Sequence, residues 1–442
     1  MNPRVVRHIL LPLHERLLRR PTRAVERGLE QSQWWPAERL ATLQVAKLRR
    51  LLSTAAANIP LWRQRFADAG IDPAGATLDE LTRLPLLDKS QLRAGGAAFT
   101  WPGVPGGLFP ATTGGSSGEP LRFWTDRARQ AADQAARTRS RRWYGIEPGE
   151  RELYLWGSPV ERTRQDRLHE WRDWLVNHRL LDAFRMTPER MRAGLAELER
   201  FNPRHLFGYP STLAMLVRFA RDGGRVPRVP ALRAVFVTGE TLQPADRDIL
   251  FDTFRVPVSN GYGAREAGFI AHECPAGRLH ITAESVIVEL LPVAGGAGDL
   301  AEVVVTHLDG LGMPLIRYRT GDLARRDSRP CPCGRALPVL AEVAGRCTDL
   351  LRRADGGAAH ALSLIYVLRD EPAVGRFRIV QRRGLDLDVS IVPAGALEPA
   401  DRARISARLA GQLGGVGVTL RLVDDLPSDA SGKFRYVASE AN

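Results

Sequence analysis

The sequence predicts an α/β protein with a large N-terminal domain built of several subdomains and a small α+β C-terminal domain. Three observations support this fold class. The chain of 442 residues is longer than one hydrophobic core usually supports. From about residue 105, short apolar runs alternate with helical stretches, as in a parallel sheet covered by helices. After about residue 345, a new pattern of strands and a helix begins.

The first 95 residues are predicted to be mostly helical. Residues 39–70 carry apolar side chains at three- and four-residue steps, and a glycine closes this stretch. In residues 77–93, Thr77 is a candidate N-cap and is followed by an acidic first turn. Lys89 stands before a helix in this segment and is interpreted as a surface cation.

Four short apolar runs are predicted to be buried strands of the sheet. They are residues 151–157, 204–209, 233–240 and 256–263. Residues 187–201 form a helical stretch between two of them. Antiparallel strands around a glycine-rich turn are expected in residues 281–307, and the small α+β unit includes residues 376–392.

The formal net charge of +13 raises the question of nucleic-acid binding. The arginines are scattered among alanines and glycines in every segment, so compositional bias is favoured and no nucleic-acid partner is expected. An anionic substrate, cofactor or membrane surface would benefit from the same field. No apolar run has the length of a membrane span. Four cysteines without a secretory signal favour a reducing cytoplasm.

Residues 5–20, VVRHILLPLHERLLRR, combine arginines with apolar side chains at roughly helical spacing. An ordinary intramolecular helix is the favoured interpretation. The alternatives are a docking helix and a helix that lies on a membrane surface, so peripheral membrane contact is left open. A homodimer is left open as well.

A segment rich in glycine and hydroxyl residues, ATTGGSSGEP, spans Ala111 to Pro120. Such a loop exposes backbone N–H groups and hydroxyls that can surround phosphate oxygens. Apolar runs on both sides predict that it joins two strands, whereas the alternative is a flexible linker. It is not a Walker A loop, because no Gly-Lys-Ser/Thr follows at the required spacing.

Four more segments with candidate site residues follow in order. The first is a tight glycine-flanked segment after a strand, and the second places a carboxylate, suited to two ribose hydroxyls, after a glycine. The third lies where the pattern changes, and the fourth carries one of only three lysines in the chain. The first of these segments holds Tyr262 and Glu266, and the second holds Asp322. The third holds Arg346 and Asp349, and the fourth holds Lys433.

This ordered set of five segments resembles the adenylate-forming superfamily of acyl-CoA synthetases, and within it the phenylacetate–CoA ligase family with its CapK-like branch. The resemblance covers nearly the whole chain, including residues 57–71 and 84–93. It implies the adenylate-forming enzyme fold. An N-terminal adenylation domain would span residues 1–346, with a helical region over 1–95 and an α/β core over 96–346. A small mobile domain carrying the catalytic lysine would span residues 347–442.

The resemblance also implies roles for single residues. Glu266 would hold Mg²⁺, Tyr262 would lie against adenine, and Lys433 would reach between the acid carboxylate and the α-phosphate of ATP. A slender ammonium suits this crowded junction better than a guanidinium. Glu119 stands where many relatives have lysine, and Arg265 where many have threonine. The implied nucleotide-binding residues are Thr112, Thr113, Gly114, Gly115, Ser116, Ser117, Gly118, Gly239, Glu240, Tyr262, Gly263, Asp322 and Arg346, with Asp349 as the hinge.

Cys274, His280, Cys331 and Cys333 are candidate ligands of a structural zinc ion. Three thiolates and an imidazole complete a tetrahedral site without an open position. The spacing is a weaker signal than two C-x₂-C motifs, but zinc at similar residues in the phenylacetate–CoA ligase-like group supports it. The alternative is four independent residues, with the cysteines buried as small hydrophobic side chains. Cys347 is interpreted as a packing residue.

The combined interpretation is an AMP-forming ligase that activates a carboxylic acid with ATP and transfers the acyl group to coenzyme A. We expect an aromatic or otherwise hydrophobic acid, with Trp156 and Phe207 as candidates for its pocket. The first alternative keeps the adenylation but uses an amine or a carrier protein as acceptor. The second is a nucleotide-binding protein without catalysis, against which the joint presence of the site residues argues. Trp171 and Trp174, at helical spacing, are assigned to the core.

Overall fold

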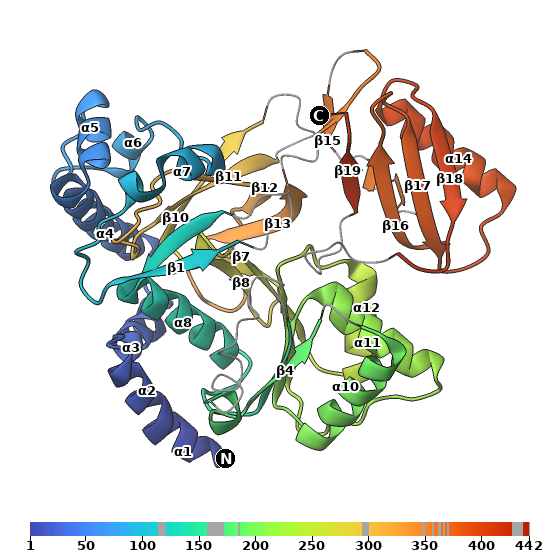
Figure 1. Ribbon diagram of the computed structural model, residues 1–442, viewed down its shortest axis with the longest axis horizontal. Coiled ribbons are helices and arrows are strands. Elements are labelled where there is room, and N and C mark those ends of the chain that lie inside the picture. Colours follow the sequence, from blue (N-terminus) through green and yellow to red (C-terminus); the bar gives the residue numbers. More distant parts are fainter. Residues whose placement is uncertain are drawn as a thin grey trace. The chain divides into compact units, whose positions relative to one another are not determined.

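The computed structural model describes most of the chain, which divides into two compact units (Figure 1). The described residues are 1–113, 121–156, 172–183, 186–293, 300–346, 350–355, 358–360, 364–365, 367–368, 371–426 and 436–441, without the side chains of 345, 346, 350 and 358–360. Unit 1 comprises Met1–Glu289, Val304–Thr320 and Arg326–Ala341. Unit 2 comprises Leu290–Val303, Gly321–Arg325 and Glu342–Asn442.

Unit 1 begins with helices, and residues 1–95 contain no strand. The stretch over residues 39–70 forms two helices rather than one, because the residue before a proline avoids the helical conformation and Pro60 restarts the helix. Thr77 caps the next helix in a capping box with Glu80, as its position predicted. The helices are α1 (Pro3–Val5), η1 (Val6–Leu10), α2 (Leu11–Leu17), α3 (Thr22–Ser32), α4 (Ala37–Asn58), α5 (Pro60–Asp68), α6 (Leu78–Leu81), α7 (Lys89–Gly95) and η2 (Gly96–Phe99).

An eleven-stranded sheet follows, in the order β10-β11-β12-β13-β9-β8-β7-β6-β5-β3-β4. Its strands are β3 (Glu152–Trp156), β4 (His178–Asp182), β5 (His205–Gly208), β6 (Ala234–Thr238), β7 (Val258–Ala264), β8 (Gly268–Glu273), β9 (Leu279–Ile281), β10 (Val286–Pro292), β11 (Ala301–His307), β12 (Tyr318–Asp327) and β13 (Val339–Arg346). The four runs predicted as strands are β3, β5, β6 and β7, and their pairing is parallel. The predicted α/β core is therefore confirmed.

The two faces of this sheet differ in chemistry. On one face, aliphatic side chains such as Leu153, Leu206 and Val235 pack with α10 (Pro188–Phe201), α11 (Pro210–Asp222) and α12 (Pro244–Phe254). On the other face lies α8 (Arg127–Arg142), whose arginines contact rings and a buried carboxylate of the sheet (Figure 1). Alternation of side chains along each strand separates the two sets.

Unit 2 is built mainly around a four-stranded sheet in the order β18-β17-β16-β19. β16 and β17 pair antiparallel over the predicted strand region, while β18 and β19 pair parallel to β17 and β16. Ile405 and Leu409 of the helix α14 pack into the core of this unit. The elements are β14 (Leu350–Arg352), β15 (Ala358–His360), β16 (Val374–Gln381), β17 (Leu387–Pro393), α14 (Pro399–Gln412), β18 (Val418–Leu422) and β19 (Val437–Ser439).

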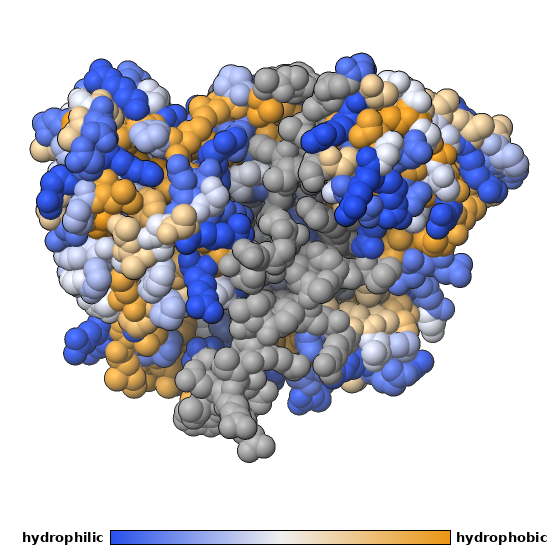
Figure 2. All heavy atoms as spheres, turned by 45° about the horizontal axis from the view of Figure 1, so that its top comes forward, coloured by the Kyte–Doolittle hydropathy of each residue, from blue (hydrophilic) through white to orange (hydrophobic). Residues whose placement is uncertain are grey.

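The surface mixes apolar and hydrophilic residues over the face drawn in Figure 2. The sequence analysis placed Trp171 and Trp174 in the core. For Trp174 this is wrong, because its side chain is 49% exposed. Trp171 lies outside the described residues. Helical spacing showed that two tryptophans could share a face but not which way that face turns. Within the described part of the chain, no helix has both the length and the apolar character needed to cross a membrane.

Candidate functional site

The glycine–hydroxyl segment connects two strands of a hairpin. β1 (Leu108–Thr112) pairs antiparallel with β2 (Arg122–Asp126), which confirms that the segment joins two strands. The backbone N–H of Thr113 donates to the carbonyl of Leu121 at 3.0 Å, and the N–H of Leu121 donates to Oγ1 of Thr113 at 2.9 Å. Gly114, Gly115, Ser116, Ser117, Gly118 and Glu119 lie outside the described residues.

The carboxyl ends of β5, β6 and β7 bring the adenine-flanking candidates to one edge of the sheet, because these strands are parallel. Gly239 follows β6 with φ of +84°, and an added Cβ would lie 2.9 Å from Cε1 of Tyr209. Only glycine allows the ring to lie this close to the backbone. Glu240 accepts a hydrogen bond from a first-turn N–H of α11 at 3.3 Å. The hydroxyl of Tyr262 lies 3.4 Å from that of Thr320.

The candidates for the acid pocket belong to an aromatic cluster at the ends of β3 and β5. The ring of Trp156 stacks on Tyr209 with centroids 4.2 Å apart, and it lies 5.5 Å from the ring of Phe207. The guanidinium of Arg137 lies 4.7 Å from the Phe207 ring centroid. Both candidates therefore lie in one cluster, together with a cation that the sequence analysis had not selected.

Glu266 is a buried carboxylate with two close contacts. The Tyr318 hydroxyl donates to its Oε1 at 2.8 Å, and Nζ of Lys89 lies 3.1 Å from the same oxygen. Burial opposes ionisation, but the Lys89 ammonium, a backbone hydrogen bond and the Tyr318 hydroxyl outweigh it and lower the pKa of Glu266. A buried, ionised carboxylate is a ligand that Mg²⁺ accepts in proteins, so Glu266 fits the expected role.

Lys89 is the site residue that sequence reasoning missed. Its interpretation as a surface cation is wrong, because its side chain is 27% exposed and pairs with Glu266. The backbone explains this placement, since Leu87 forms a parallel bridge with Tyr318 and so carries the start of α7 to β12. Arg317 holds the same segment by donating to the carbonyls of Thr82, at 2.6 Å, and Leu84. Asp88 then caps α7 directly before the lysine.

Arg265, the departure from the family pattern, connects the Glu266 segment to the hairpin. Its guanidinium donates to the carbonyl of Thr112 at 3.0 Å, and its own carbonyl accepts from Arg129 at 2.9 Å. Residue 263 must be glycine for a steric reason, because a Cβ added to Gly263 would lie 2.5 Å from the carbonyl oxygen of Gly268. The turn between β7 and β8 is thus held close to the end of β1.

The remaining nucleotide and hinge candidates belong to unit 2 or lie outside the described residues. Asp322 is half-buried on β12 and follows Gly321, which has φ of +77°. The backbone of Arg346 ends β13, and its side chain is not among those described. Asp349, Lys433 and Cys347 lie outside the described residues.

The four candidate zinc ligands come together in unit 1, with their donor atoms all within 4.8 Å of one another. Sγ of Cys274 lies 3.6 Å from Sγ of Cys331, and Sγ of Cys333 lies 3.3 Å from Nε2 of His280. These separations are close to the edges of a tetrahedron with Zn–S bonds of about 2.3 Å. Nδ1–H of His280 donates to the carbonyl of Leu337 at 3.1 Å, which directs Nε2 toward the sulfurs. Burial lowers the pKa of His280 to about 4, so the ring is neutral at pH 7.

Comparison with known proteins supports the adenylate-forming family that the sequence analysis predicted, although no family model matches the chain. The chain is 24% identical to Protein CapK from Staphylococcus aureus over 344 residues, which cover 74% of each chain. Over an alignment of 454 positions, which covers 91% of this chain and 97% of that one, it is 25% identical to phenylacetate-coenzyme A ligase from Thermus thermophilus. A solved structure of 2-hydroxyisobutyryl-CoA ligase matches its fold with a TM-score of 0.73 at 21% identity, covering 92% of this chain and 91% of that one.

The adenylate-forming fold predicted from the sequence is therefore confirmed. The similarity to phenylacetate–coenzyme A ligases and to CapK supports the adenylate-forming, phenylacetate–CoA ligase/CapK-like family to which the sequence analysis pointed.

Proposed function

We propose that this ligase activates a carboxylic acid with ATP to an acyl-adenylate and transfers the acyl group to coenzyme A. The observation that carries the proposal is the buried, ionised Glu266, held by Lys89 and Tyr318 beside the end of β7. Coenzyme A is the proposed acceptor because the curated relative that covers 91% of the chain is named for that acceptor.

The first half-reaction brings two anions together, since a carboxylate oxygen attacks the α-phosphorus of ATP and pyrophosphate leaves. Lys433 is proposed to bind both partners as they meet, and loss of one such donor typically costs about 10²–10³ in rate. Glu266 would hold Mg²⁺, which when bound offsets charge on the phosphate oxygens. Tyr262 and the Gly239 turn are proposed to flank the adenine, and Asp322 and Arg346 to contact the ribose.

The second half-reaction transfers the acyl group from AMP to the thiol of coenzyme A. We propose that residues 347–442 form the mobile domain and turn about Asp349 between the two steps, since a hinge absorbs its dihedral change at very few residues. An amine or carrier protein as acceptor would use the same first half-reaction. Product analysis with each acceptor distinguishes these outcomes.

The acid is proposed to be aromatic or otherwise hydrophobic. The rings of Trp156, Tyr209 and Phe207 form a continuous aromatic cluster at the ends of β3 and β5, and Gly239 leaves room for the Tyr209 ring. Aromatic rings bury large areas and stack on flat substrates. An acid with a ring or an extended hydrocarbon chain therefore suits this surface better than a small polar acid does.

Zinc is proposed at Cys274, His280, Cys331 and Cys333. All four donors come from the protein, which leaves no coordination position for substrate. The zinc ion would therefore stabilise the connection between β8, β9 and the segment around residue 332, and would take no part in the reaction.

The test is acid-dependent ATP–pyrophosphate exchange with aryl, fatty and amino acids. We expect exchange with an aromatic or hydrophobic acid, and its loss in Lys433→Ala despite retained ATP binding. Lys433→Arg is the matched control: it keeps the charge but is expected to lose most activity, because the guanidinium is broader. Absence of exchange with every acid, or undiminished exchange in Lys433→Ala, would contradict the proposal.

A further inference from the structure

Exposed apolar side chains gather on the N-terminal helices. Among the described residues, eleven large hydrophobic side chains are exposed, and five of them are Met1, Val5, Ile9, Leu13 and Leu17. The last four recur at four-residue intervals, with exposed fractions of 38%, 59%, 53% and 74%. A surface helix usually turns such a stripe toward the core, so this row indicates an interaction surface.

The winding of the helix keeps the row on one side. α1, η1 and α2 continue into one another as a single rod (Figure 1), about 22 Å long from Pro3 to Leu17. Four-residue steps in an α-helix drift by about 40° around the axis. The wider π-turn of η1, in which the N–H of Leu11 donates to the carbonyl of Val6, rotates less per residue and works against this drift.

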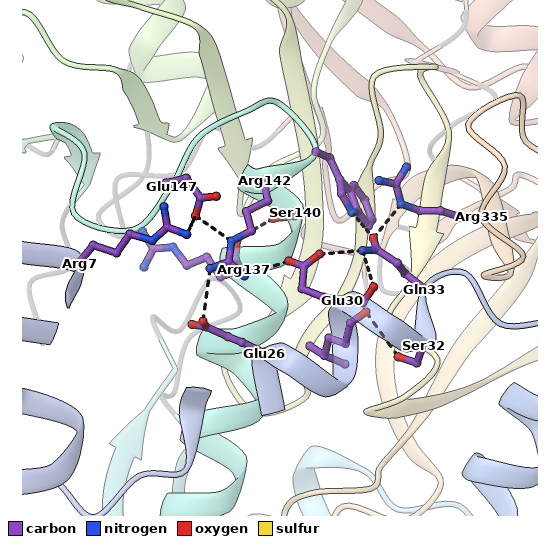
Figure 3. Close-up of polar contacts among 12 residues, drawn as sticks. Arg7, Glu26, Glu30, Ser32, Gln33, Arg137, Ser140, Arg142, Glu147 and Arg335 are labelled. Carbon is purple, nitrogen blue, oxygen red and sulfur yellow. Dashed lines mark hydrogen bonds and ion pairs between the residues drawn. The ribbon is translucent and has the colours of Figure 1, made fainter. Parts of the chain in front are cut away.

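The other side of the rod is fastened to the protein. Val6 is fully buried, and Arg7 forms an ion pair with Glu147 at 3.1 Å. Glu147 also accepts from Arg142 of α8 at 2.9 Å, and Figure 3 shows Arg142 directed toward two glutamates of α3 as well. The exposed row therefore belongs to a fixed helix whose outward face is set by the buried Val6 and by the ion pair of Arg7 with Glu147.

Basic side chains border the row. Residues 1–23 contain six arginines and a single acid, Glu15. Arg20 and Thr22 both donate to Glu15, and its side chain is only 13% exposed, so it adds little negative charge to the outer face. Arg16 and Arg19 are exposed. An aliphatic row with positive borders is the pattern of a helix that lies in a membrane interface.

We propose that this face binds the surface of an anionic phospholipid bilayer. The aliphatic row would enter the acyl boundary, and the arginines would meet lipid phosphates. A second copy of the chain would present the same arginines, so charge complementarity favours lipid over self-association. Trp174 lies near the start of the rod, since Asn177 donates to the carbonyl of Met1 at 3.1 Å, and tryptophan favours the interfacial region of a bilayer.

The test is co-sedimentation of the full chain with vesicles of phosphatidylcholine alone or mixed with phosphatidylglycerol. We expect binding to the mixed vesicles that weakens with salt. The double variant Ile9→Gln/Leu13→Gln should lower the partition coefficient about tenfold or more, because both side chains lose apolar contact with lipid. Arg16→Gln/Arg19→Gln should lower it about tenfold and reduce its salt dependence.

Val226→Gln and Arg192→Gln change an exposed aliphatic and an exposed basic residue elsewhere and should leave binding unchanged. No binding of the unmodified chain to anionic vesicles at low salt would overturn the proposal, and so would equal binding of the Ile9→Gln/Leu13→Gln variant. Sedimentation velocity without vesicles measures whether the chain self-associates. A concentration-dependent dimer that this double variant abolishes would assign the face to a second copy instead.

Discussion

The two ends of strand β8 hold polar groups in opposite ways. Before the strand, Glu266 is a buried anion whose contacts are the ammonium of Lys89 and the hydroxyl of Tyr318, both from distant segments. After the strand, Cys274 joins a set of four sulfur and nitrogen donors whose atoms all lie within 4.8 Å of one another. A carboxylate held by an ammonium can exchange its partner for a metal and substrate, whereas a complete donor set cannot accept one. The end of β8 at Glu266 is therefore suited to a role in the reaction, and the end at Cys274 is suited to stabilising the fold.

The largest expected effect is on stability, at the cysteine end. Cys331→Ser should remove one bound zinc per chain and lower the free energy of unfolding by about 4 kcal/mol or more, because three ligands hold the ion less tightly. Zinc content by mass spectrometry and unfolding in urea measure both. Cys347→Ser is the matched control and should keep the zinc. Full stability of Cys331→Ser would contradict the assignment.

The next effect is on catalysis, at the other end of β8. Glu266→Gln keeps the size of the side chain but removes its charge, so adenylation should fall by about 10²–10³, or about 3–4 kcal/mol. The zinc content should stay unchanged. ATP–pyrophosphate exchange at saturating substrate measures the loss. A change of less than tenfold would show that the carboxylate is not needed for the first half-reaction.

Lys89→Met should reduce stability by about 2 kcal/mol, less than for a fully buried pair because the lysine is partly exposed. The lowered pKa of Glu266 contributes stability that is present near neutral pH and is lost as pH falls through that pKa. Without Lys89, burial raises the pKa, so the acid loss of stability and of exchange should begin at higher pH. Unfolding and exchange measured across pH test this, with Lys89→Arg as the variant that keeps the charge. If stability and exchange of Lys89→Met fell at the same acidic pH as in the unmodified chain, Lys89 would not control the pKa of Glu266.

The smallest effect compares two tyrosines. Tyr318→Phe removes a hydrogen bond to an ionised carboxylate and should cost about 1.5 kcal/mol, with a loss of exchange of about tenfold. Tyr144→Phe removes a bond of 3.0 Å to the neutral carbonyl of Glu273 at the other end of β8, so it should cost about 1 kcal/mol without changing exchange. Equal losses of exchange in both variants would mean that the two ends are not functionally distinct.

Much of the fold could be predicted from local patterns. The strands β3, β5, β6 and β7 are short buried runs between turn residues, and the helix over residues 187–201 has a clear period. The four zinc candidates could be proposed because their residue types are few and chemically distinctive. The signals for the strands and the helix do not depend on where distant segments pack, whereas the zinc candidates needed the fold to bring Cys274 and His280 to Cys331 and Cys333.

The role of Lys89 could not be predicted in this way. Its partner Glu266 lies far along the sequence, and the contact depends on the bridge between Leu87 and Tyr318. The scattered arginines gave a similar difficulty, since Arg139 of α8 is buried against Glu284 and contributes to packing rather than to a binding surface. Pairings across long sequence separations are fixed by the fold, and composition cannot show them.

The central claim is that one end of β8 serves the reaction and the other serves stability. It is tested most directly by measuring both ATP–pyrophosphate exchange and unfolding on Glu266→Gln and Cys331→Ser. Glu266→Gln is expected to lose exchange and keep its zinc, and its free energy of unfolding should fall by only about 2 kcal/mol, as in Lys89→Met, because the same ion pair is lost. Cys331→Ser is expected to lose zinc and stability while it retains exchange at temperatures where it stays folded. Undiminished exchange in Glu266→Gln would contradict the assignment of this carboxylate to adenylation.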